Sequence, residues 1–530
     1  MKRNILLGII VFIISGFIFY FNIINSFFLS DDFHLIYSVK INGPFGIWSN
    51  SLWPFFRPLI SLSFFVDYKL WGLNPAGYHI TNIFIHSLNA FLVSIIVLFL
   101  MKKEYSYAGA GNLAFFSGLL FLIMPCHTEA VSWISGRCDV IATFLFLLSF
   151  CSYLSYKKYN KLQYLLASLL FFVLALFSKE SVIIYPLVIL SFELYSYIEK
   201  ENKDYNLLRI LYLPLIYSLL VILYIPFRSL IIGRLVGGYG TNFHLNFKPP
   251  LVINNLFLYT IRSFLFASPL FQTSIILISL GIILIFIINL KRAILLTKVK
   301  ILYFLITAFL VSLIPVINIG NWTGDTQGER FIYLPTIFSS IIIVFLFNFF
   351  LRNKKYFIFS SLCLLFICGI SLYNVNRNWI TAGEISKSIL HSIKTMGKFN
   401  RLCIINLSDN IRGAYIYRNG IKEALYLFAC LNDFADIEVV LYHNIFEKKD
   451  AVIIEKLSEP DKYKVKLLNT KTLFYPINMF GRHRSNCVVD RPEIRNSLDN
   501  SFSIIKLKKL NEDEKLLFYS KGRMEQFSHN

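Results

Sequence analysis

The sequence predicts an α-helical polytopic membrane protein with a small α/β domain at its C-terminal end. Of the 530 residues, 56% are hydrophobic and 17% aromatic, which is more apolar surface than one water-soluble core of this length can bury. The apolar residues are grouped in nearly charge-free runs, such as 5–21, 275–290 and 339–351, that reach membrane-crossing length with their flanks. Beyond residue 390, short apolar stretches alternate with polar segments, a pattern typical of strands in water.

Short clusters of Lys and Arg between the runs set the expected orientation, because such clusters favour the cytoplasmic side. A topology with about 11 spans places all six clusters on the cytoplasmic side. It also places the N-terminus inside and the C-terminal domain outside. The expected spans are 4–24, 81–101, 111–125, 139–156, 163–178, 182–198, 210–229, 273–291, 300–319, 331–351 and 356–373. If the stretch 251–269 crossed the membrane, the basic cluster Lys291–Lys300 would lie on the outer side. We therefore expect an interfacial or re-entrant helix there.

The chain is therefore divided into a membrane domain (1–373), a linker (374–389) and an extracytoplasmic α/β domain (390–530). Strands are expected at 401–407, 436–443, 464–469 and 501–507, and a helix at 420–431. Abundant Lys, Asn, Ile and Phe are typical of an AT-rich bacterial genome, so a bacterial inner or plasma membrane is the expected location.

The formal charge of +21 argues for lipid partners and against nucleic acid, because many of the basic residues lie in short loops and form no continuous face. Membrane lipids or a phosphate-bearing lipid substrate are the expected polyanions. The eight cysteines show no paired spacing of the kind that binds zinc.

Two adjacent carboxylates, Asp31 and Asp32, are expected to close the first span in SDDFHLI. They can supply a general base or ligands for a divalent ion such as Mg²⁺ or Mn²⁺; a solvated helix cap is the alternative. Arg57 in FFRPLISLSF can bind a phosphate of the substrate, or simply reach a lipid head group.

The outer loop PCHTEAVSWISGRCD places four ionisable side chains within thirteen residues: His127, Glu129, Arg137 and Asp139. An acid, a base and a guanidinium together can position a hydroxyl and hold a phosphate, whereas a salt-bridged turn is the alternative.

The pairs Lys179-Glu180 and Glu329-Arg330 begin two later spans. A cation at a helix N-terminus opposes the helix dipole, and a bound anion would offset that cost. In the alternative, each cation pairs with its neighbouring Glu.

A polar stripe runs along the second span, where His79, Asn82, His86 and Asn89 recur at spacings of three or four residues. Such stripes usually bond neighbouring helices. The alternative is that His79, Asn82 and His86 line the acceptor or donor cavity.

Several separated motifs resemble one known family. The stretches 56–90, 125–139, FSKES (177–181) and GERFIYLP (328–335) are similar to the membrane part of the transmembrane and tetratricopeptide-repeat O-mannosyltransferases and their bacterial relatives, members of the GT-C superfamily. The similarity covers roughly residues 25–345, with the HTEA-to-GRCD loop as its most specific part. After that the chain departs from the family, because no tetratricopeptide repeat follows.

The resemblance implies a GT-C-like fold and an inverting glycosyltransferase, expected to be a hexosyltransferase, that moves a sugar from a polyprenyl-phosphate donor to an acceptor hydroxyl on the outer face. It implies Asp31 as general base and Asp32 as its partner or a metal ligand. The expected acceptor side is formed by His127, Glu129 and Asp139, and the expected donor-phosphate side by Arg57, Arg137, Lys179, Glu180 and Arg330. The acceptor, a protein, glycan or lipid, stays open.

Two alternatives remain at this point. A glycan polymerase or ligase would use the same cations on a polyprenyl-diphosphate-linked glycan. A transporter of lipid-linked sugars would need no covalent transfer, but transporters tend to show duplicated halves, and this sequence does not.

Overall fold

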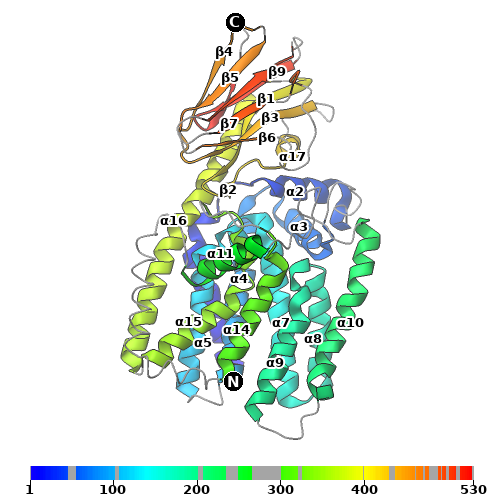
Figure 1. Ribbon diagram of the computed structural model, residues 1–530, viewed down its shortest axis with the longest axis vertical. Helices are drawn as coiled ribbons and strands as arrows, with labels where there is room; N and C mark the ends of the chain where they lie inside the picture. The colour runs from blue at the N-terminus through cyan, green and yellow to red at the C-terminus, as the bar shows by residue number, and fades with distance from the viewer. Residues whose placement is uncertain are drawn as a thin grey trace.

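A bundle of apolar helices carries the α/β domain at one end in the computed structural model, and the N-terminus lies at the opposite end of the bundle (Figure 1). The structure describes residues 2–45, 55–101, 107–200, 207–233, 249–265, 300–319, 325–351, 353–397 and, with short gaps, 399–527.

The helices before residue 201 are α1 (Lys2–Tyr20), α2 (Asp31–Asn42), α3 (Pro58–Trp71), α4 (Pro75–Met101), α5 (Tyr107–Ile123), α6 (Thr128–Val131), α7 (Arg137–Tyr159), α8 (Leu162–Leu176) and α9 (Tyr185–Lys200). Those after it are α10 (Leu207–Ile232), α11 (Pro249–Leu265), α14 (Lys300–Leu313), α15 (Thr336–Phe350) and α16 (Lys354–Thr395). The helices α2 and α3 lie across the end of the bundle, beneath the α/β domain (Figure 1).

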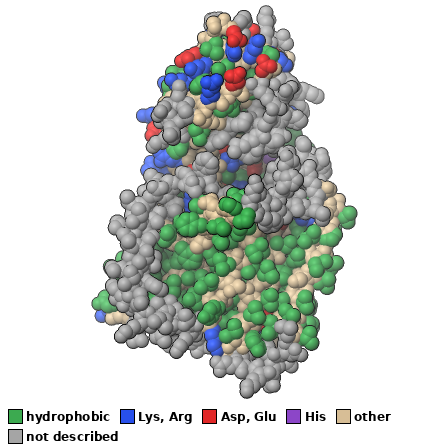
Figure 2. Space-filling view, viewed as in Figure 1, with side chains coloured by type: hydrophobic (Ala, Val, Ile, Leu, Met, Phe, Trp, Pro, Cys, Tyr) green, Lys and Arg blue, Asp and Glu red, His purple; other side chains and the backbone are tan. Residues whose placement is uncertain are grey.

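The chain is a multi-pass membrane protein. Six of the described helices are long and apolar enough to cross a bilayer, and α5 with α6, bent by 52°, would make a seventh. Three shorter apolar helices accompany them, and the predicted span 273–291 lies outside the described residues, so the number of about 11 spans stays a prediction. Hydrophobic side chains cover the helical part of the face seen in Figure 2, whereas charged side chains gather on the α/β domain.

The helix α4 packs in the centre of the first half of the bundle, against α1, α5 and α7. Glycines make the close approaches possible. A Cβ added at Gly16 of α1 would overlap the Ser87 hydroxyl, and one at Gly118 of α5 would lie 2.6 Å from the Ala90 carbonyl oxygen. Close backbone contact through small residues is a usual way for helices to associate in lipid.

One expected boundary, that of the linker, needs correction. The interval 374–389, expected to be a linker, continues α16, a helix of 42 residues that runs from the bundle into the α/β domain (Figure 1). Its buried positions, such as Leu372, Trp379 and Ile389, keep helical spacing, so the apolar face never stops. In the stretch 251–269, the described residues belong to α11, which is not among the candidate spans and packs against α15 and the 3₁₀ turn Glu329–Ile332. Its expected interfacial or re-entrant placement stays a prediction.

The α/β domain confirms the expected strands and helix. Its first sheet contains β1 (Arg401–Ile411), β2 (Ala414–Tyr415), β3 (Asp436–Ile445), β6 (Phe474–Pro476), β9 (Glu514–Ser520) and β10 (Arg523–Gln526). Its second, antiparallel sheet contains β4 (Val452–Lys456), β5 (Lys462–Leu467), β7 (Glu493–Asn496) and β8 (Ser501–Lys506). The helix α17 (Ile421–Leu427) lies between β2 and β3.

The central strand β1 runs parallel to β3 on one side and to β9 on the other. Its side chains alternate between two cores: Leu402 and Ile404 join the core that is continuous with the bundle, while Cys403 and Ile405 join the core with the second sheet. The carboxyl end of β1 leads into β2 at the junction with the bundle, where open α/β sheets commonly place functional groups (Figure 1).

The junction rests on residues 413–420, which we call the docking loop. Its two glycines, Gly413 and Gly420, have positive φ. A Cβ added at Gly413 would lie 2.7 Å from the Thr326 backbone nitrogen, and one added at Gly420 would overlap the Ser30 carbonyl oxygen. The loop therefore touches the membrane domain with its backbone at both ends.

Gly420→Ala is expected to weaken this docking, because a left-handed alanine costs about 1–2 kcal/mol and its methyl group meets Ser30. Limited proteolysis of the purified protein should cut between the two domains faster than in the wild type. Gly522→Ala is the matched control, since Gly522 also has positive φ but contacts Lys448 within the α/β domain. Equal sensitivity of both variants would contradict the role of the docking loop.

Candidate functional site

The acidic pair begins a helix of its own. The first helix ends at Tyr20, a 3₁₀ turn follows to Ile23, and Asp31 and Asp32 form the first turn of α2. The expectation that the pair closes the first span is therefore wrong. Carboxylates in a first turn are stabilised by the helix dipole, and Ser30 before them has a φ of 47°, in the sparsely populated left-handed region.

Asp32 is buried and serves the packing of its own segment. Its Oδ2 accepts from the Leu29 backbone N–H at 2.9 Å, and its Oδ1 accepts from the Ser135 backbone N–H at 2.8 Å and from the Ser135 hydroxyl. Burial raises the pKa of Asp32 to about 7, although these hydrogen bonds act in the opposite direction.

Asp31 instead lines a cavity of about 70 Å³ at the end of the bundle. Two arginines, Arg57 and Arg330, also line the cavity, together with apolar and aromatic residues. Its lining residues are Asp31, Leu35, Phe55, Arg57, Ile60, Ser61, Trp133, Ser135, Cys138 and Arg330. Residues from four separate stretches of the sequence thus meet at one small space.

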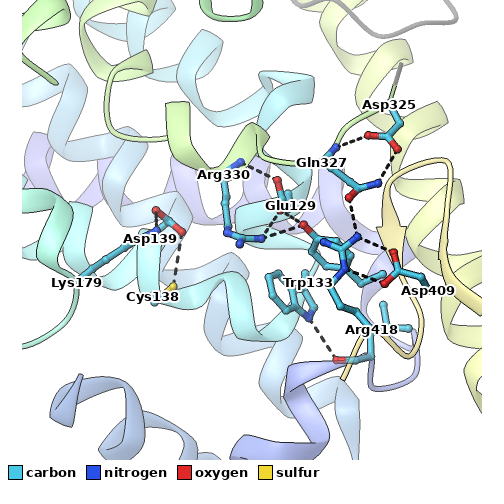
Figure 3. Close-up of polar contacts among 12 residues, drawn as sticks. Glu129, Trp133, Cys138, Asp139, Lys179, Asp325, Gln327, Arg330, Asp409 and Arg418 are labelled. Carbon is cyan, nitrogen blue, oxygen red and sulfur yellow. Dashed lines mark hydrogen bonds and ion pairs between the residues drawn. The ribbon is translucent and has the colours of Figure 1, made fainter. Parts of the chain in front are cut away.

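Glu129 holds Arg330 in place at this cavity (Figure 3). The fully buried Glu129 carboxylate forms an ion pair with the Arg330 guanidinium, accepts from the Arg330 backbone N–H at 3.0 Å, and accepts from the Tyr415 hydroxyl at 2.8 Å. Burial raises the pKa of Tyr415, which keeps the phenol a donor. The Arg330 guanidinium lies over the Trp133 ring, 5.1 Å from its centroid.

Arg57 is oriented in the same way by Glu180. The Glu180 carboxylate accepts from Arg57 Nη2 at 2.6 Å and from Nε at 3.1 Å, a two-point contact that fixes the guanidinium plane. The Arg57 guanidinium also lies over the Phe55 ring, at 4.0 Å.

Lys179 and Glu329, the other members of the sequence pairs Lys179-Glu180 and Glu329-Arg330, have partners elsewhere. Lys179 forms an ion pair with Asp139, and Glu329 forms one with Arg262 of α11. The two cations therefore pair with distant carboxylates, Lys179 with Asp139 and Arg330 with Glu129. The alternative that each cation pairs with its neighbouring Glu is not what the structure shows. The Lys179–Asp139 pair lies beside Cys138, whose Sγ donates to Asp139 at 3.6 Å (Figure 3).

Arg137 lies away from the cavity lining and is fully buried. Its Nη1 is 2.6 Å from Asp67, its Nη2 donates to the Tyr78 carbonyl oxygen at 3.2 Å, and its guanidinium lies over the Phe64 ring at 4.4 Å. These contacts tie α3 and α4 to α7, and a donor-phosphate role for Arg137 stays a prediction without a contact to support it.

The histidines and amides of the predicted polar stripe bond other segments of the bundle. Asn82 donates to three carbonyl oxygens of residues 131–134, and His79 contacts the Ser26 carbonyl oxygen at 3.1 Å. His86 contacts the Tyr333 hydroxyl at 2.6 Å. None of the three is in the cavity lining that the described residues form.

His127 is also inside the bundle, where its Nε2 lies 2.7 Å from the Thr336 hydroxyl. It shares an aromatic cluster with His86 and Tyr333. Like the polar stripe, it is brought near the site but not to the cavity lining.

Three residues of the docking loop belong to the site, and sequence reasoning missed them. Tyr415 donates to Glu129, Asn419 donates to Asp31 at 2.8 Å, and Arg418 lies over the Tyr415 ring at 4.3 Å. The sequence YRNG carries an Asn-Gly turn signal, but nothing in it indicates contact with residues almost 400 positions earlier.

Arg418 extends the network towards residues 325–327 (Figure 3). It makes a two-point contact with Asp409, at 2.9 and 2.6 Å, and donates to Gln327 at 2.7 Å. Gln327 in turn donates to both carboxylate oxygens of Asp325, at 2.9 and 2.8 Å.

A divalent cation at the acidic pair would have to be held by Asp31. Asp32 is occupied by three hydrogen bonds, and no group of three or more His, Cys, Asp or Glu side chains is arranged for a metal within the described part of the chain. The pair as a whole therefore does not fit a chelating site, and metal dependence stays a prediction.

The comparisons with known proteins agree with the resemblance seen in the sequence. Human protein O-mannosyl-transferase TMTC1 is 34% identical over 181 residues, which are 30% of this chain and 20% of that protein. Mouse protein O-mannosyl-transferase TMTC2 is 39% identical over 101 residues, 19% of this chain and 11% of that protein. The chain thus spans a fifth or less of the length of these relatives, and the resemblance to the family is confirmed over that part.

No family model matches the chain. Among solved structures, ArnT from Cupriavidus metallidurans bound to undecaprenyl phosphate aligns with 82% of this chain and 92% of its own, at 11% identity and a TM-score of 0.34. The similarity in sequence, and not this one in coordinates, supports the resemblance to the O-mannosyltransferases.

The raised pKa of Asp32 predicts a pH dependence of stability. An unfolded aspartate carboxyl releases its proton near its usual pKa of 3.8, whereas folded Asp32 keeps it to about pH 7, so folding loses this contribution as the pH rises between the two values. The melting temperature of Asp32→Asn should therefore fall less between pH 5 and pH 7.5 than that of the wild type. Ser392→Ala, at a site remote from Asp32 in sequence, serves as control. An identical pH dependence in wild type and Asp32→Asn would rule out the shift.

Proposed function

We propose that the chain is an inverting glycosyltransferase that moves a sugar from a polyprenyl-phosphate donor to an acceptor hydroxyl. The observation that carries the proposal is the cavity, which is lined by Asp31, Arg57 and Arg330 together. The sequence similarity to protein O-mannosyl-transferases supports it and favours a hexose, with mannose as the first sugar to test.

In this reaction, Asp31 takes the proton of the acceptor hydroxyl as its oxygen attacks the anomeric carbon. The bond between that carbon and the phosphate oxygen breaks, and its electron pair leaves with the polyprenyl phosphate. Attack from the side opposite the leaving group inverts the configuration. The leaving group is an anion that needs cations more than it needs a proton donor.

Arg57 and Arg330 are the proposed ligands of the donor phosphate. Each guanidinium has a carboxylate on one side, Glu180 and Glu129, which fixes its plane before the substrate arrives. A guanidinium carries five N–H donors, so it can hold a carboxylate and a phosphate at once. Glu129 and Glu180 then act through the arginines they orient. The charge of Lys179 is paired with Asp139 beside Cys138, so a direct role of Lys179 at the phosphate stays a prediction.

The site lies where a lipid-linked donor can reach it. It sits at the end of the apolar bundle, so an isoprenoid tail can stay in the bilayer while the phosphate enters the cavity. We place this end on the extracytoplasmic side, with the N-terminus in the cytoplasm, and leave the acceptor as a protein, glycan or lipid hydroxyl.

Asp31→Asn is expected to lower the transfer of radiolabelled mannose from polyprenyl-phosphate mannose by about 10²–10⁴-fold, the usual contribution of a general base. Membranes of the native host supply the acceptors. The donor should still bind, because the cations are unchanged. Asp461→Asn, between β4 and β5 in the second sheet of the α/β domain, serves as control. Transfer retained in Asp31→Asn would remove Asp31 from the mechanism.

Arg330→Lys is expected to weaken the binding of polyprenyl phosphate about 10- to 100-fold, since hydrogen bonds to charged groups contribute about 1.5–3 kcal/mol and Lys lacks the planar fork. Stabilisation of the purified protein by added polyprenyl phosphate measures the affinity. Arg523→Lys on the exposed β10 is the matched control. Unchanged affinity in Arg330→Lys would contradict the assignment.

Mass spectrometry of lipid-linked sugars in a strain lacking the gene separates the proposal from its rival. Accumulation of a monosaccharide-phosphate lipid agrees with it. Accumulation of an oligosaccharide-diphosphate lipid would instead identify a glycan polymerase or ligase.

A further inference from the structure

The α/β domain contributes its docking loop to the proposed active site. The Ser30 backbone N–H donates to the Ile416 carbonyl oxygen at 2.8 Å, and the Phe33 and Tyr417 rings stack at 5.5 Å between centroids. Both contacts flank Asp31 in sequence. The backbone that carries the proposed base is therefore held by the α/β domain as well as by the bundle.

One side chain of the loop reaches the base itself. Asn419 Nδ2 donates to Asp31 Oδ1 at 2.8 Å, and within the described residues this is the hydrogen bond that the Asp31 side chain receives. Both residues are half-buried, so the bond is shielded from bulk water on part of its surface. Asp32, one position further on, receives its hydrogen bonds from the membrane domain instead.

We propose that Asn419 is a positioning residue for the base Asp31, so that the α/β domain is required for transfer and not only for stability. The inference rests on the function proposed above. A base must present a lone pair to the acceptor hydroxyl, and a donor bound at one oxygen fixes the plane of the carboxylate.

Docking alone does not require this hydrogen bond. Glu423 of α17 lies 3.0 Å from His34 of α2 and joins the two domains close by, four residues after Asn419 and three after Asp31. The backbone bond from Ser30 and the glycine contacts of the loop add to that contact. Removal of the Asn419 amide should therefore leave the domain in place and affect Asp31.

The experiment compares Asn419→Ala, Asn419→Asp and the matched control Glu423→Gln in the purified full-length protein. The donor is polyprenyl-phosphate mannose. Asn419→Ala should lower kcat about 10-fold, the size expected for a hydrogen bond to a charged group, with the KM for the donor within about twofold of the wild type. Glu423→Gln should leave kcat close to the wild-type value.

Asn419→Asp places a second carboxylate against Asp31, and neighbouring carboxylates disfavour each other's ionisation. Its rate should therefore begin to rise at a higher pH, by about one unit, with the same resistance to proteolysis as the wild type. A merely structural role of Asn419 would not move the pH profile.

The outcomes separate the two proposals. If Asp31→Asn abolishes transfer but both Asn419 variants behave like Glu423→Gln, the inference about Asn419 is overturned and the proposed function stands. If the wild type transfers no sugar from any polyprenyl-phosphate donor, the function itself fails. If Asn419→Ala loses transfer together with its resistance to proteolysis, Asn419 serves docking, and the inference is likewise overturned.

Discussion

The arrangement at the junction depends on one buried carboxylate. Glu129 has no exposed surface, and it is bonded to Arg330 twice and to Tyr415 once. A buried charge without a partner costs several kcal/mol, so these contacts have to form together. Because the three residues come from an outer loop of the bundle, from the turn before α15 and from the α/β domain, the charge joins three distant parts of the chain.

The same constraint explains why the charged motifs lie far apart in sequence and close together in space. Asp139 pairs with Lys179, Arg57 with Glu180, and Glu329 with Arg262. A charge at the end of an apolar bundle is stable only with an opposite charge from another helix, and each such pair fixes two helices relative to each other. The Arg137–Asp67 pair is the least exposed of these pairs. The cavity is the place where cations held in this way meet Asp31.

Much of the fold could be predicted from the sequence, because apolar runs and strand patterns are local signals. The strands near 401–407 and 436–443 are where they were expected, and so are the apolar helices that lie within the described residues. The continuation of α16 was missed because polar residues such as Asn376 and Arg377 interrupt the apolar run while its buried face continues.

The site was predicted only in part, because charges beside spans are a local signal but their pairing is not. Asp31, Arg57 and Arg330 stood out as charges beside spans, and they do meet at one cavity. The pairings that orient the arginines could not be found from the sequence, because a contact across 123 residues (Arg57–Glu180) or 201 residues (Glu129–Arg330) leaves no local trace. Asn419 was missed because it belongs to an ordinary turn of the α/β domain.

The most direct test of the account is an experimental structure of the protein with bound polyprenyl phosphate. The account predicts the phosphate in the cavity, in contact with the Arg330 and Arg57 guanidiniums and beside an Asp31 side chain that Asn419 holds. A phosphate bound elsewhere, or an Asp31 carboxylate turned out of the cavity, would contradict it.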